Sequence, residues 1–239
     1  MDIAASTVIN RIAQLDWPAL EDHLHTHGFA ATGALLTPAE CQTLSSLYPE
    51  REVFRSRVVM ARHGFGQGEY KYFAYPLPEL VQSLREALYP RLAPVANRWH
   101  QAMGLDVTFP DSLEAMLERC HAAGQARPTP LLLKYGPTDY NCMHQDLYGG
   151  HVFPIQATFL LSSPAAFVGG EFVMVEQRPR MQSRPRVVPL VQGEAVLFAV
   201  HQRPVQGTRG AYRVNMRHGV SEVLSGERFT MGVIFHDAA

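Results

Sequence analysis

The second half of the chain has the pattern of a series of short strands. Apolar residues alternate with polar ones or cluster in short segments rich in β-branched and aromatic residues, and Gly, Pro or Ser bounds each segment. About eight such segments follow one another without a helical period between them: 130–136, 140–147, 153–163, 169–177, 186–190, 193–200, 212–220 and 228–235. This density predicts a sandwich or a double-sheet barrel, and the number fits a jelly roll.

Helical periods occur in the first half instead. Apolar residues with helical spacing occupy 7–15, and Asp16-Trp17-Pro18 then has the form of an N-cap with Pro in the first turn of a second helix. That helix is predicted to end at about His27, before Gly28. Thr37-Pro38-Ala39-Glu40 has the form of a capping box and predicts a helix to about Tyr48.

Two more helical regions precede the strands. An apolar-periodic segment covers 77–103, and because Pro90 and Pro94 each remove a helical hydrogen bond, we expect two helices there. A further helix is predicted from Ser112 to about Ala123. The pattern therefore predicts a helical N-terminal layer packed on a C-terminal β-barrel as one unit.

The composition is that of a packed globular protein. The 239 residues are 46% hydrophobic and 18% charged, which excludes disorder. No stretch reaches the ~18 consecutive apolar residues of a membrane span, and the first residues lack the apolar segment of a secretory signal. The three scattered cysteines, Cys41, Cys120 and Cys142, make no disulfide framework. We therefore expect a cytoplasmic protein without a membrane partner.

Positive charge is concentrated in one stretch. The formal net charge is −1, but residues 178–217 contain eight Arg and one acid, Glu194, which gives this stretch a charge of +7. A basic face of this kind can attract phosphates or other anions. A solvated surface is the simpler interpretation, because the whole chain is not basic as a dedicated nucleic-acid binder would be.

His144 and Asp146 are the first candidates for chemistry. Residues two apart in a strand point to the same face, so these two side chains can reach one metal ion. Imidazole together with carboxylate suits iron(II), manganese or zinc. His-X-Asp is common by chance, and a second His from a distant strand is needed: His151, His201, His218 and His236 are available.

His218 is favoured because Arg228 follows it by ten residues, at the start of a predicted strand. The interval has the pattern of strand, tight turn at Ser225-Gly226, and strand, so we expect an antiparallel hairpin that places both side chains on one inner face. A guanidinium inside a barrel needs a carboxylate partner, which a bound dicarboxylate would supply.

The ordered set His144, Asp146, His218 and Arg228 resembles that of the iron(II)/2-oxoglutarate-dependent dioxygenases. Further segments are similar to the prolyl-hydroxylase-like branch of that family: 133–136, which includes Tyr135, the Gly-Gly-Glu turn in 167–172, and the strand 193–198. The resemblance implies an α+β, mainly β fold with a double-stranded β-helix (jelly-roll) core and N-terminal helices packed on it. It implies one dioxygenase domain, 1–239, with mainly helical support and a candidate lid in 1–128 and the catalytic jelly-roll core in 129–239.

The same resemblance implies the cofactors and the roles of the site residues. His144, Asp146 and His218 would bind Fe(II), and Arg228, with Tyr135 nearby, would bind the far carboxylate of 2-oxoglutarate. Two His and one carboxylate leave open positions on iron for the co-substrate and O2. The products would be succinate, CO2 and an oxidised substrate C–H bond.

Other residues have alternative interpretations. His201 could replace His218 if the strand register differs, and otherwise lies near the site or at its edge. Cys142 is more typical of a small core residue than of a ligand. The aromatic residues in 70–75, after the Gly-rich loop, fit ordinary core or a lid over the metal that offers stacking to a planar substrate.

The substrate stays open between classes. The nearest resemblance is to bacterial oxygenases assigned to oxidative demethylation of damaged nucleic acids, and the basic stretch fits that substrate. Alkylated-base demethylases carry a second Arg six residues after the first, whereas position 234 is Ile, and the His-to-Arg spacing resembles that of prolyl and other side-chain hydroxylases. A protein or small-molecule hydroxylase is therefore the alternative. A non-redox metal-binding module, or a cupin-like isomerase or hydrolase, is the alternative of another class.

Overall fold

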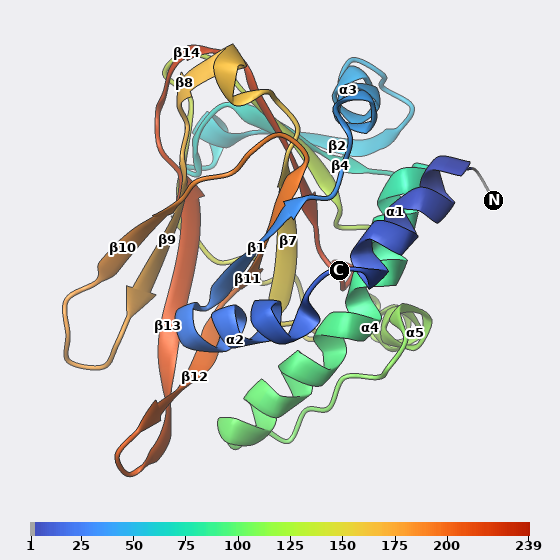
Figure 1. Ribbon diagram of the computed structural model, residues 1–239. Helices are drawn as coiled ribbons and strands as arrows, with labels where there is room; N and C mark the ends of the chain where they lie inside the picture. The colour runs from blue at the N-terminus through green and yellow to red at the C-terminus, as the bar shows by residue number, and fades with distance from the viewer. Residues whose placement is uncertain (1–2) are drawn as a thin grey trace.

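Two antiparallel sheets face each other and form the body of the protein (Figure 1). The computed structural model describes residues 3–239. The seven-stranded sheet has the order β1-β11-β7-β15-β5-β4-β2, and the second sheet has the order β10-β9-β13-β6-β3 with β12 paired to β13. A small sheet pairs β14 with β8. The predicted double-sheet barrel is confirmed.

The strands of the second half lie where the alternation predicts them. They are β5 (Leu131–Tyr135), β6 (Tyr140–His144), β7 (Ile155–Leu160), β8 (Phe167–Gly169), β9 (Phe172–Gln177), β10 (Arg184–Val188), β11 (Glu194–Ala199), β12 (Gln202–Gly207), β13 (Gly210–Val220), β14 (Val223–Gly226) and β15 (Arg228–Val233). All six residues of β7 are buried, because that strand is central in its sheet and both of its faces are covered.

The first half contributes strands as well as helices, which its helical periods did not predict. These strands are β1 (Phe29–Ala34), β2 (Phe54–Val59), β3 (Gly66–Gln67) and β4 (Glu69–Phe73). Strand β1 pairs with β11, and β4 pairs with β5. Pairing with a distant strand stabilises these short segments, and such long-range pairing leaves little local signal.

The helices lie to one side of the sheets, as Figure 1 shows for α1, α4 and α5. They are α1 (Ile3–Ala13), α2 (Trp17–His27), α3 (Pro38–Ser46), α4 (Glu79–Ala102) and α5 (Leu113–Ala122), with short 3₁₀ turns η1 (Met60–Arg62) and η2 (Pro164–Ala166). The predicted start signals are confirmed. Asp16 accepts a hydrogen bond from the Ala19 N–H, and Thr37 and Glu40 form a capping box.

Helix α4 corrects the prediction of two helices in 77–103, because Pro90 and Pro94 both lie inside one continuous helix. Pro90 cannot donate to the carbonyl of Glu86, nor Pro94 to that of Pro90. Glu86 and both prolines are exposed, so the carbonyls that lose a partner face water. The opposite face, which includes Leu84, Leu88 and Trp99, is buried in the core and holds the helix together.

The interval between His218 and Arg228 also differs from the prediction. Strand β13 pairs with β6 and β9, whereas β15 pairs with β5 and β7 in the other sheet, so the two strands do not form a hairpin. The connecting strand β14 pairs with β8 instead. The chain crosses from one sheet to the other here, and this crossing places His218 and Arg228 on facing walls.

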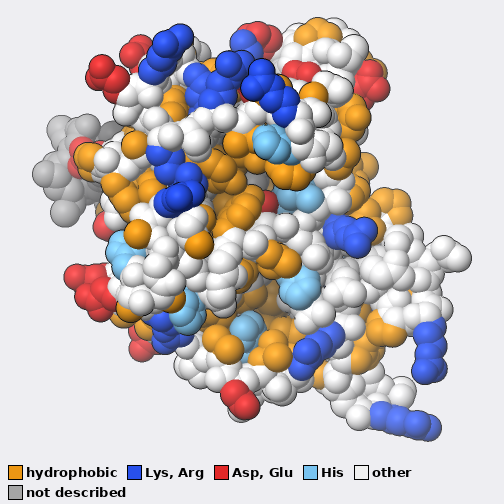
Figure 2. All heavy atoms as spheres, turned by 180° about the vertical axis from the view of Figure 1, so that it is seen from behind, with side chains coloured by type: hydrophobic (Ala, Val, Ile, Leu, Met, Phe, Trp, Pro, Cys, Tyr) orange, Lys and Arg blue, Asp and Glu red, His pale blue; other side chains and the backbone are white. Residues whose placement is uncertain are grey.

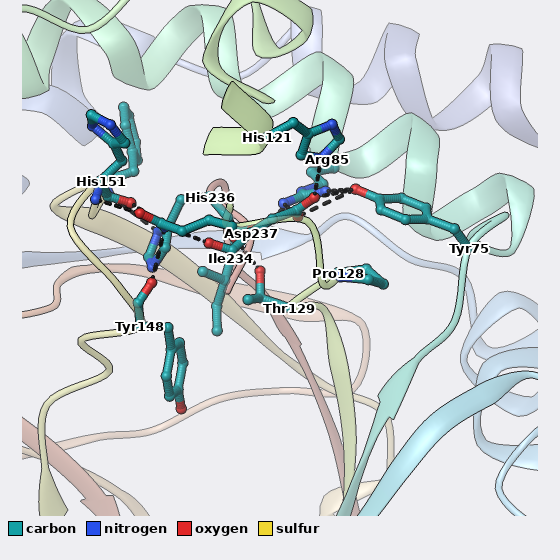
Figure 3. Close-up of polar contacts among 12 residues, drawn as sticks. Tyr75, Arg85, His121, Pro128, Thr129, Tyr148, His151, Ile234, His236 and Asp237 are labelled. Carbon is teal, nitrogen blue, oxygen red and sulfur yellow. Dashed lines mark hydrogen bonds and ion pairs between the residues drawn. The ribbon is translucent and has the colours of Figure 1, made fainter. Parts of the chain in front are cut away.

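Arg85 and Asp237 join the long helix to the end of the chain. Arg85 donates to the Asp237 carboxylate at 2.8 Å and to the carbonyl of Ile234, and both side chains of the ion pair are fully buried. Figure 3 shows Tyr75 and His121 on the same carboxylate, with Nε2 of His121 at 2.8 Å from Oδ2.

None of the helices in the described residues is long and apolar enough to cross a membrane. The cytoplasmic location stays a prediction.

Candidate active site

Three side chains that could bind a metal converge between the sheets. Their ligand atoms, from His144, Asp146 and His218, all lie within 4.8 Å of one another. Residues 144 and 218 are directly opposite each other in the β6–β13 pair, and their rings are 4.2 Å apart between centroids. Asp146 lies two residues after the end of β6, and each of its carboxylate oxygens lies 3.4 Å from Nε2 of one histidine. The structure thus brings together the three residues that the resemblance named.

Local contacts fix how each imidazole is presented. Nδ1 of His144 lies 2.8 Å from the carbonyl oxygen of Cys142, to which it can only donate, so Nε2 keeps its lone pair and faces the cluster. The ring of His218 packs between Phe172 and Phe198, at centroid distances of 5.9 and 4.6 Å. A metal-binding histidine is commonly oriented in this way by its other ring nitrogen or by packing.

Two residues that the sequence interpretation missed hold the Asp146 carboxylate. The Tyr148 hydroxyl donates to Oδ1 and the Gln156 amide to Oδ2, both at 2.7 Å. The available signal for Gln156 was that it and Thr158 are the two polar residues of the mainly apolar segment 153–161. The only sequence signal for Tyr148 was its position two residues after Asp146.

Asp146 is held in its charged form. Burial by itself would raise the pKa of this carboxyl, but hydrogen bonds with His144 and His218 outweigh burial and hold the pKa well below its usual value. A buried carboxylate between two imidazoles provides one oxygen and two nitrogen donors, the set that suits a divalent transition metal with open positions. These residues therefore fit an iron(II) ion.

A cavity of about 370 Å³ opens from this cluster. The seven-stranded sheet lines it with Leu131, Leu133, Tyr135, Thr158, Arg228, Thr230 and Gly232. The facing sheet and its loops contribute Phe65, Met143, Phe172 and Val220. The volume lies in the range of small-molecule sites, and a mainly apolar lining with few polar groups is typical of them.

Arg228 lies in the wall of this cavity as a buried cation without an acid. Its side chain is 2% exposed, and neither Nε nor Nη1 has a hydrogen-bond partner among the described residues. Its guanidinium carbon lies 5.6 Å from the ring centre of Tyr135 and 5.8 Å from that of Phe167. Burial lowers the pKa of Arg228 to about 10. A buried charge without a partner is costly, so this geometry fits an anionic ligand such as the far carboxylate of 2-oxoglutarate.

The loop that follows Asp146 is fastened to the end of the chain by Gln125. Its amide donates to the carbonyls of Tyr148, His151 and Asp237, and its own oxygen accepts from the His151 N–H. Gly149, with φ of 99°, passes so close to Gln125 that a Cβ there would lie 2.4 Å from its side chain. Figure 3 shows Tyr148 and His151 beside the Asp237 cluster, so this network supports Tyr148 and, through it, Asp146.

The remaining candidates lie away from the ligand cluster. His201 does not belong to it, and its backbone carbonyl accepts from the Met216 N–H. Cys142 is exposed and lines the cavity, so the core interpretation was wrong.

The aromatic residues in 70–75 have different surroundings: Tyr70 lines the cavity, Phe73 is in the core, and Tyr75 contacts Asp237. His236 is buried, and its Nδ1 accepts from the Phe153 N–H.

Comparisons with known proteins agree with this site. Residues 68–238 match the family model Oxygenase-NA, described as an oxygenase catalysing oxidative methylation of damaged DNA. The chain is 50% identical over 168 residues to the uncharacterized proteins Rv2227 and MT2286 from two strains of Mycobacterium tuberculosis, a match that covers 70% of this chain and 72% of each relative.

The fold is similar to that of several solved oxygenases. A Trichoplax adhaerens prolyl hydroxylase in complex with a hypoxia inducible factor peptide fragment has a TM-score of 0.58 at 13% identity, covering 93% of this chain and 89% of that one. A Burkholderia pseudomallei oxidoreductase of the 2OG-Fe(II) oxygenase family has a TM-score of 0.56 at 15% identity, covering 95% and 94%. A Pseudomonas putida prolyl-4-hydroxylase has a TM-score of 0.55 at 16% identity, covering 90% and 96%. The predicted jelly-roll fold is therefore confirmed.

Proposed function

The chain belongs to the Oxygenase-NA family and, by family and fold, is an iron(II)- and 2-oxoglutarate-dependent oxygenase; we propose that its substrate is a methylated base in damaged nucleic acid. One observation carries the enzymatic part of the proposal. Three ligand atoms converge at one cavity whose wall also holds the unpartnered guanidinium of Arg228. A metal-binding module without a co-substrate has no use for that buried cation.

The protein's own residues have separate tasks in this reaction. His144, Asp146 and His218 hold the metal. Arg228 and Tyr135 hold the far carboxylate of 2-oxoglutarate, which neutralises the buried charge. When bound, iron and 2-oxoglutarate supply the activation of O2 that inserts one oxygen atom into a substrate C–H bond, with succinate and CO2 as the other products.

Two contacts keep the ligand set in place during this chemistry. Tyr148 and Gln156 each donate to one oxygen of Asp146, which orients the carboxylate and preserves its charge. The apolar walls, including Leu131, Leu133 and Phe172, limit the water that reaches the reacting centre.

The features that support a base as substrate lie at the mouth of the cavity. Phe65 and Met143 line the cavity and are also exposed, at 47% and 36%. Apolar and aromatic surface at the opening of a mainly apolar pocket favours a flat, weakly charged group, and enzymes that modify bases take them out of the stack into such pockets. Oxidation of an N-methyl carbon gives an N-hydroxymethyl group that is lost as formaldehyde, so the expected outcome on a damaged base is removal of its methyl group.

The direct test measures both products together. The iron-loaded chain is incubated with 2-oxoglutarate, ascorbate and single-stranded oligonucleotides that carry one N-methylated base, and succinate and formaldehyde are quantified. We expect equal amounts of the two products, and neither product from His218→Ala. His201→Ala, which changes a histidine outside the cluster, should retain activity.

Succinate without formaldehyde from any methylated oligonucleotide would contradict the nucleic-acid substrate. In that case a gain of one oxygen atom in a proline-containing peptide would establish the protein-hydroxylase alternative. No succinate under any of these conditions would contradict the enzymatic proposal itself.

A further inference from the structure

The structure sorts the eight arginines of 178–217 into two groups. Four are used internally. Arg203 and Arg178 both pair with Glu176, Arg213 donates to the carbonyl of Met103, and Arg186 contacts His27. The side chains of the other four make no hydrogen bond, ion pair or ring contact with another described residue: Arg180, Arg184, Arg209 and Arg217. In the basic stretch 178–217, four arginines therefore stabilise the fold and four leave their positive charge unpaired among the described residues.

Arg217 is the free arginine that lies closest to the chemistry. It neighbours His218 on β13 and points outward, as the alternation of exposed and buried residues on that strand requires. Beside it is a surface groove of about 210 Å³, lined by Gln145, Val175, Gln177, Ser183, Asn215 and Arg217. No acidic residue lines this groove, so it presents a cation with amide and hydroxyl groups.

The groove and the cavity share one lining residue. Gln145 lines both, and it lies in the chain between the metal-binding residues His144 and Asp146. The Gln145 amide donates to the carbonyl of Met216 at 2.8 Å, which fixes the side chain at the boundary. Gln145 therefore marks the place where the groove lies nearest in the chain to the metal-binding residues.

On the other side of the cavity mouth lies a stacked pair of rings, Phe65 and His63, which is called the Phe65–His63 step below. The loop that includes Gly64 and Phe65 lies against β6, where the Phe65 carbonyl accepts from the Cys142 N–H. The Phe65 ring stacks on His63 at 5.3 Å between centroids and 23° between planes. Arg62, two residues before Gly64, is exposed, and its side chain makes no hydrogen bond, ion pair or ring contact with another described residue.

The surface view agrees with this arrangement. Figure 2 shows hydrophobic side chains gathered over the middle of the rear face, with Lys and Arg side chains around them. The hairpins β9–β10 and β12–β13, which project from the barrel in Figure 1, carry such side chains toward their tips.

We propose that one single strand of nucleic acid lies across the cavity mouth, with a base on the Phe65–His63 step and a neighbouring backbone phosphate on Arg217 in the groove. This inference rests on the proposed function and specifies the path of its substrate. Stacking on an aromatic side chain requires a base that is free of its own stack, as in a single strand. The free guanidinium of Arg217 supplies a charge-assisted, bidentate contact to phosphate.

The test is binding of a fluorescently labelled 15-nucleotide single-stranded DNA by the full-length chain, followed by anisotropy at several salt concentrations. Arg217→Gln should weaken binding about 5- to 30-fold and reduce the slope of log affinity against log salt by about 0.7, because one phosphate contact is lost. Phe65→Leu should weaken binding about 5-fold or more while leaving that slope unchanged, since stacking releases no counterions. Arg91→Gln removes the same charge from α4, outside groove and cavity, and should change binding less than 2-fold.

The outcomes separate this inference from the proposed function. If Arg217→Gln binds with the wild-type affinity and salt slope while the wild-type chain releases formaldehyde from methylated DNA, the path is wrong and the function stands. Equal losses in Arg217→Gln and Arg91→Gln would also overturn the path, because the effect would be general electrostatics. If the wild-type chain neither binds DNA nor demethylates it, both proposals fail.

Discussion

His218 and Arg228 are ten residues apart in the chain, but they lie in opposite sheets and both line the same cavity. His218 belongs to the ligand cluster, and Arg228 is buried across from it, with Nε and Nη1 lacking a hydrogen-bond partner in the part of the chain that the structure describes. The short segment between them, including β14, crosses from one sheet to the other. The distance between the ligand cluster and the proposed co-substrate anchor is therefore set by the spacing of two packed sheets and not by a turn.

Substitution of Arg228 should change the KM for 2-oxoglutarate more than it changes kcat. Arg228→Gln removes the charge-assisted contact to the far carboxylate, so the KM for 2-oxoglutarate should rise about 10- to 100-fold, with a smaller change in kcat at saturation. The measurement is succinate formation as a function of 2-oxoglutarate. Lys134→Gln, on the neighbouring strand but outside the cavity lining, is the matched control. An unchanged KM in Arg228→Gln would exclude Arg228 as the anchor.

Tyr148 should tune the affinity for the metal. Tyr148→Phe removes the hydrogen bond to Oδ1 of Asp146 while keeping the ring, and the loss of such a supporting contact typically lowers metal affinity about 10- to 100-fold. Titration with Mn(II), followed by electron paramagnetic resonance, measures this directly. Tyr140→Phe changes an exposed tyrosine and should bind the metal as the wild type does. Equal affinities for all three proteins would show that Asp146 needs no such support.

Two ion pairs on the same helix should differ strongly in their contribution to stability. Arg85→Ala removes the buried cation that pairs with Asp237 and leaves the buried carboxylate with Tyr75 and His121 only, so the free energy of unfolding should fall by about 3–5 kcal/mol. Arg98 also lies on α4, but it pairs with Glu21 at the surface and its side chain is 56% exposed. Arg98→Ala should cost less than about 1 kcal/mol. Urea unfolding of both variants checks the contrast, and similar losses would refute it.

His236 should make the protein sensitive to acid. Burial, with a smaller contribution from Arg85, lowers the pKa of His236 to about 4. The unfolded chain, with a histidine pKa near 6.5, binds this proton first, so stability falls as the pH drops from about 6.5 to 4. Between pH 7 and pH 5, His236 should account for about 2 kcal/mol of the loss.

The variant His236→Asn tests this, because its amide oxygen can still accept from the Phe153 N–H but does not titrate in this range. Its free energy of unfolding should fall less than that of the wild type between the two pH values, by about the amount given above. His25→Asn, at an exposed position, should follow the wild type. An identical pH dependence in His236→Asn would show that another group causes the acid sensitivity.

The helix starts and the strand positions follow from local patterns. The capping box at Thr37 and the cap at Asp16 were predicted correctly, because a cap depends on residues within one turn. The alternating segments of the second half form strands for the same reason, since a two-residue period fixes which face is buried. Residue types offered His144, Asp146 and several further histidines as ligands, and the spacing to Arg228 together with the family resemblance singled out His218.

Contacts between distant parts of the chain were not accessible in this way. The continuity of α4 through Pro90 and Pro94 depends on which side of the helix faces water, and the pairing of β1 with β11 depends on a partner far along the chain. The hairpin predicted between His218 and Arg228 was wrong because local spacing cannot distinguish a turn within one sheet from a crossing between two.

The sequence by itself therefore determined the local elements and the chemical identity of the site, because both depend on near neighbours and on side-chain type. Only the tertiary structure decided that Tyr148 and Gln156 hold Asp146, that Arg228 is buried without a hydrogen-bond partner for Nε and Nη1 among the described residues, and that Gln145 lines both cavity and groove. These relationships arise where the two sheets pack face to face, and that packing is a property of the whole fold.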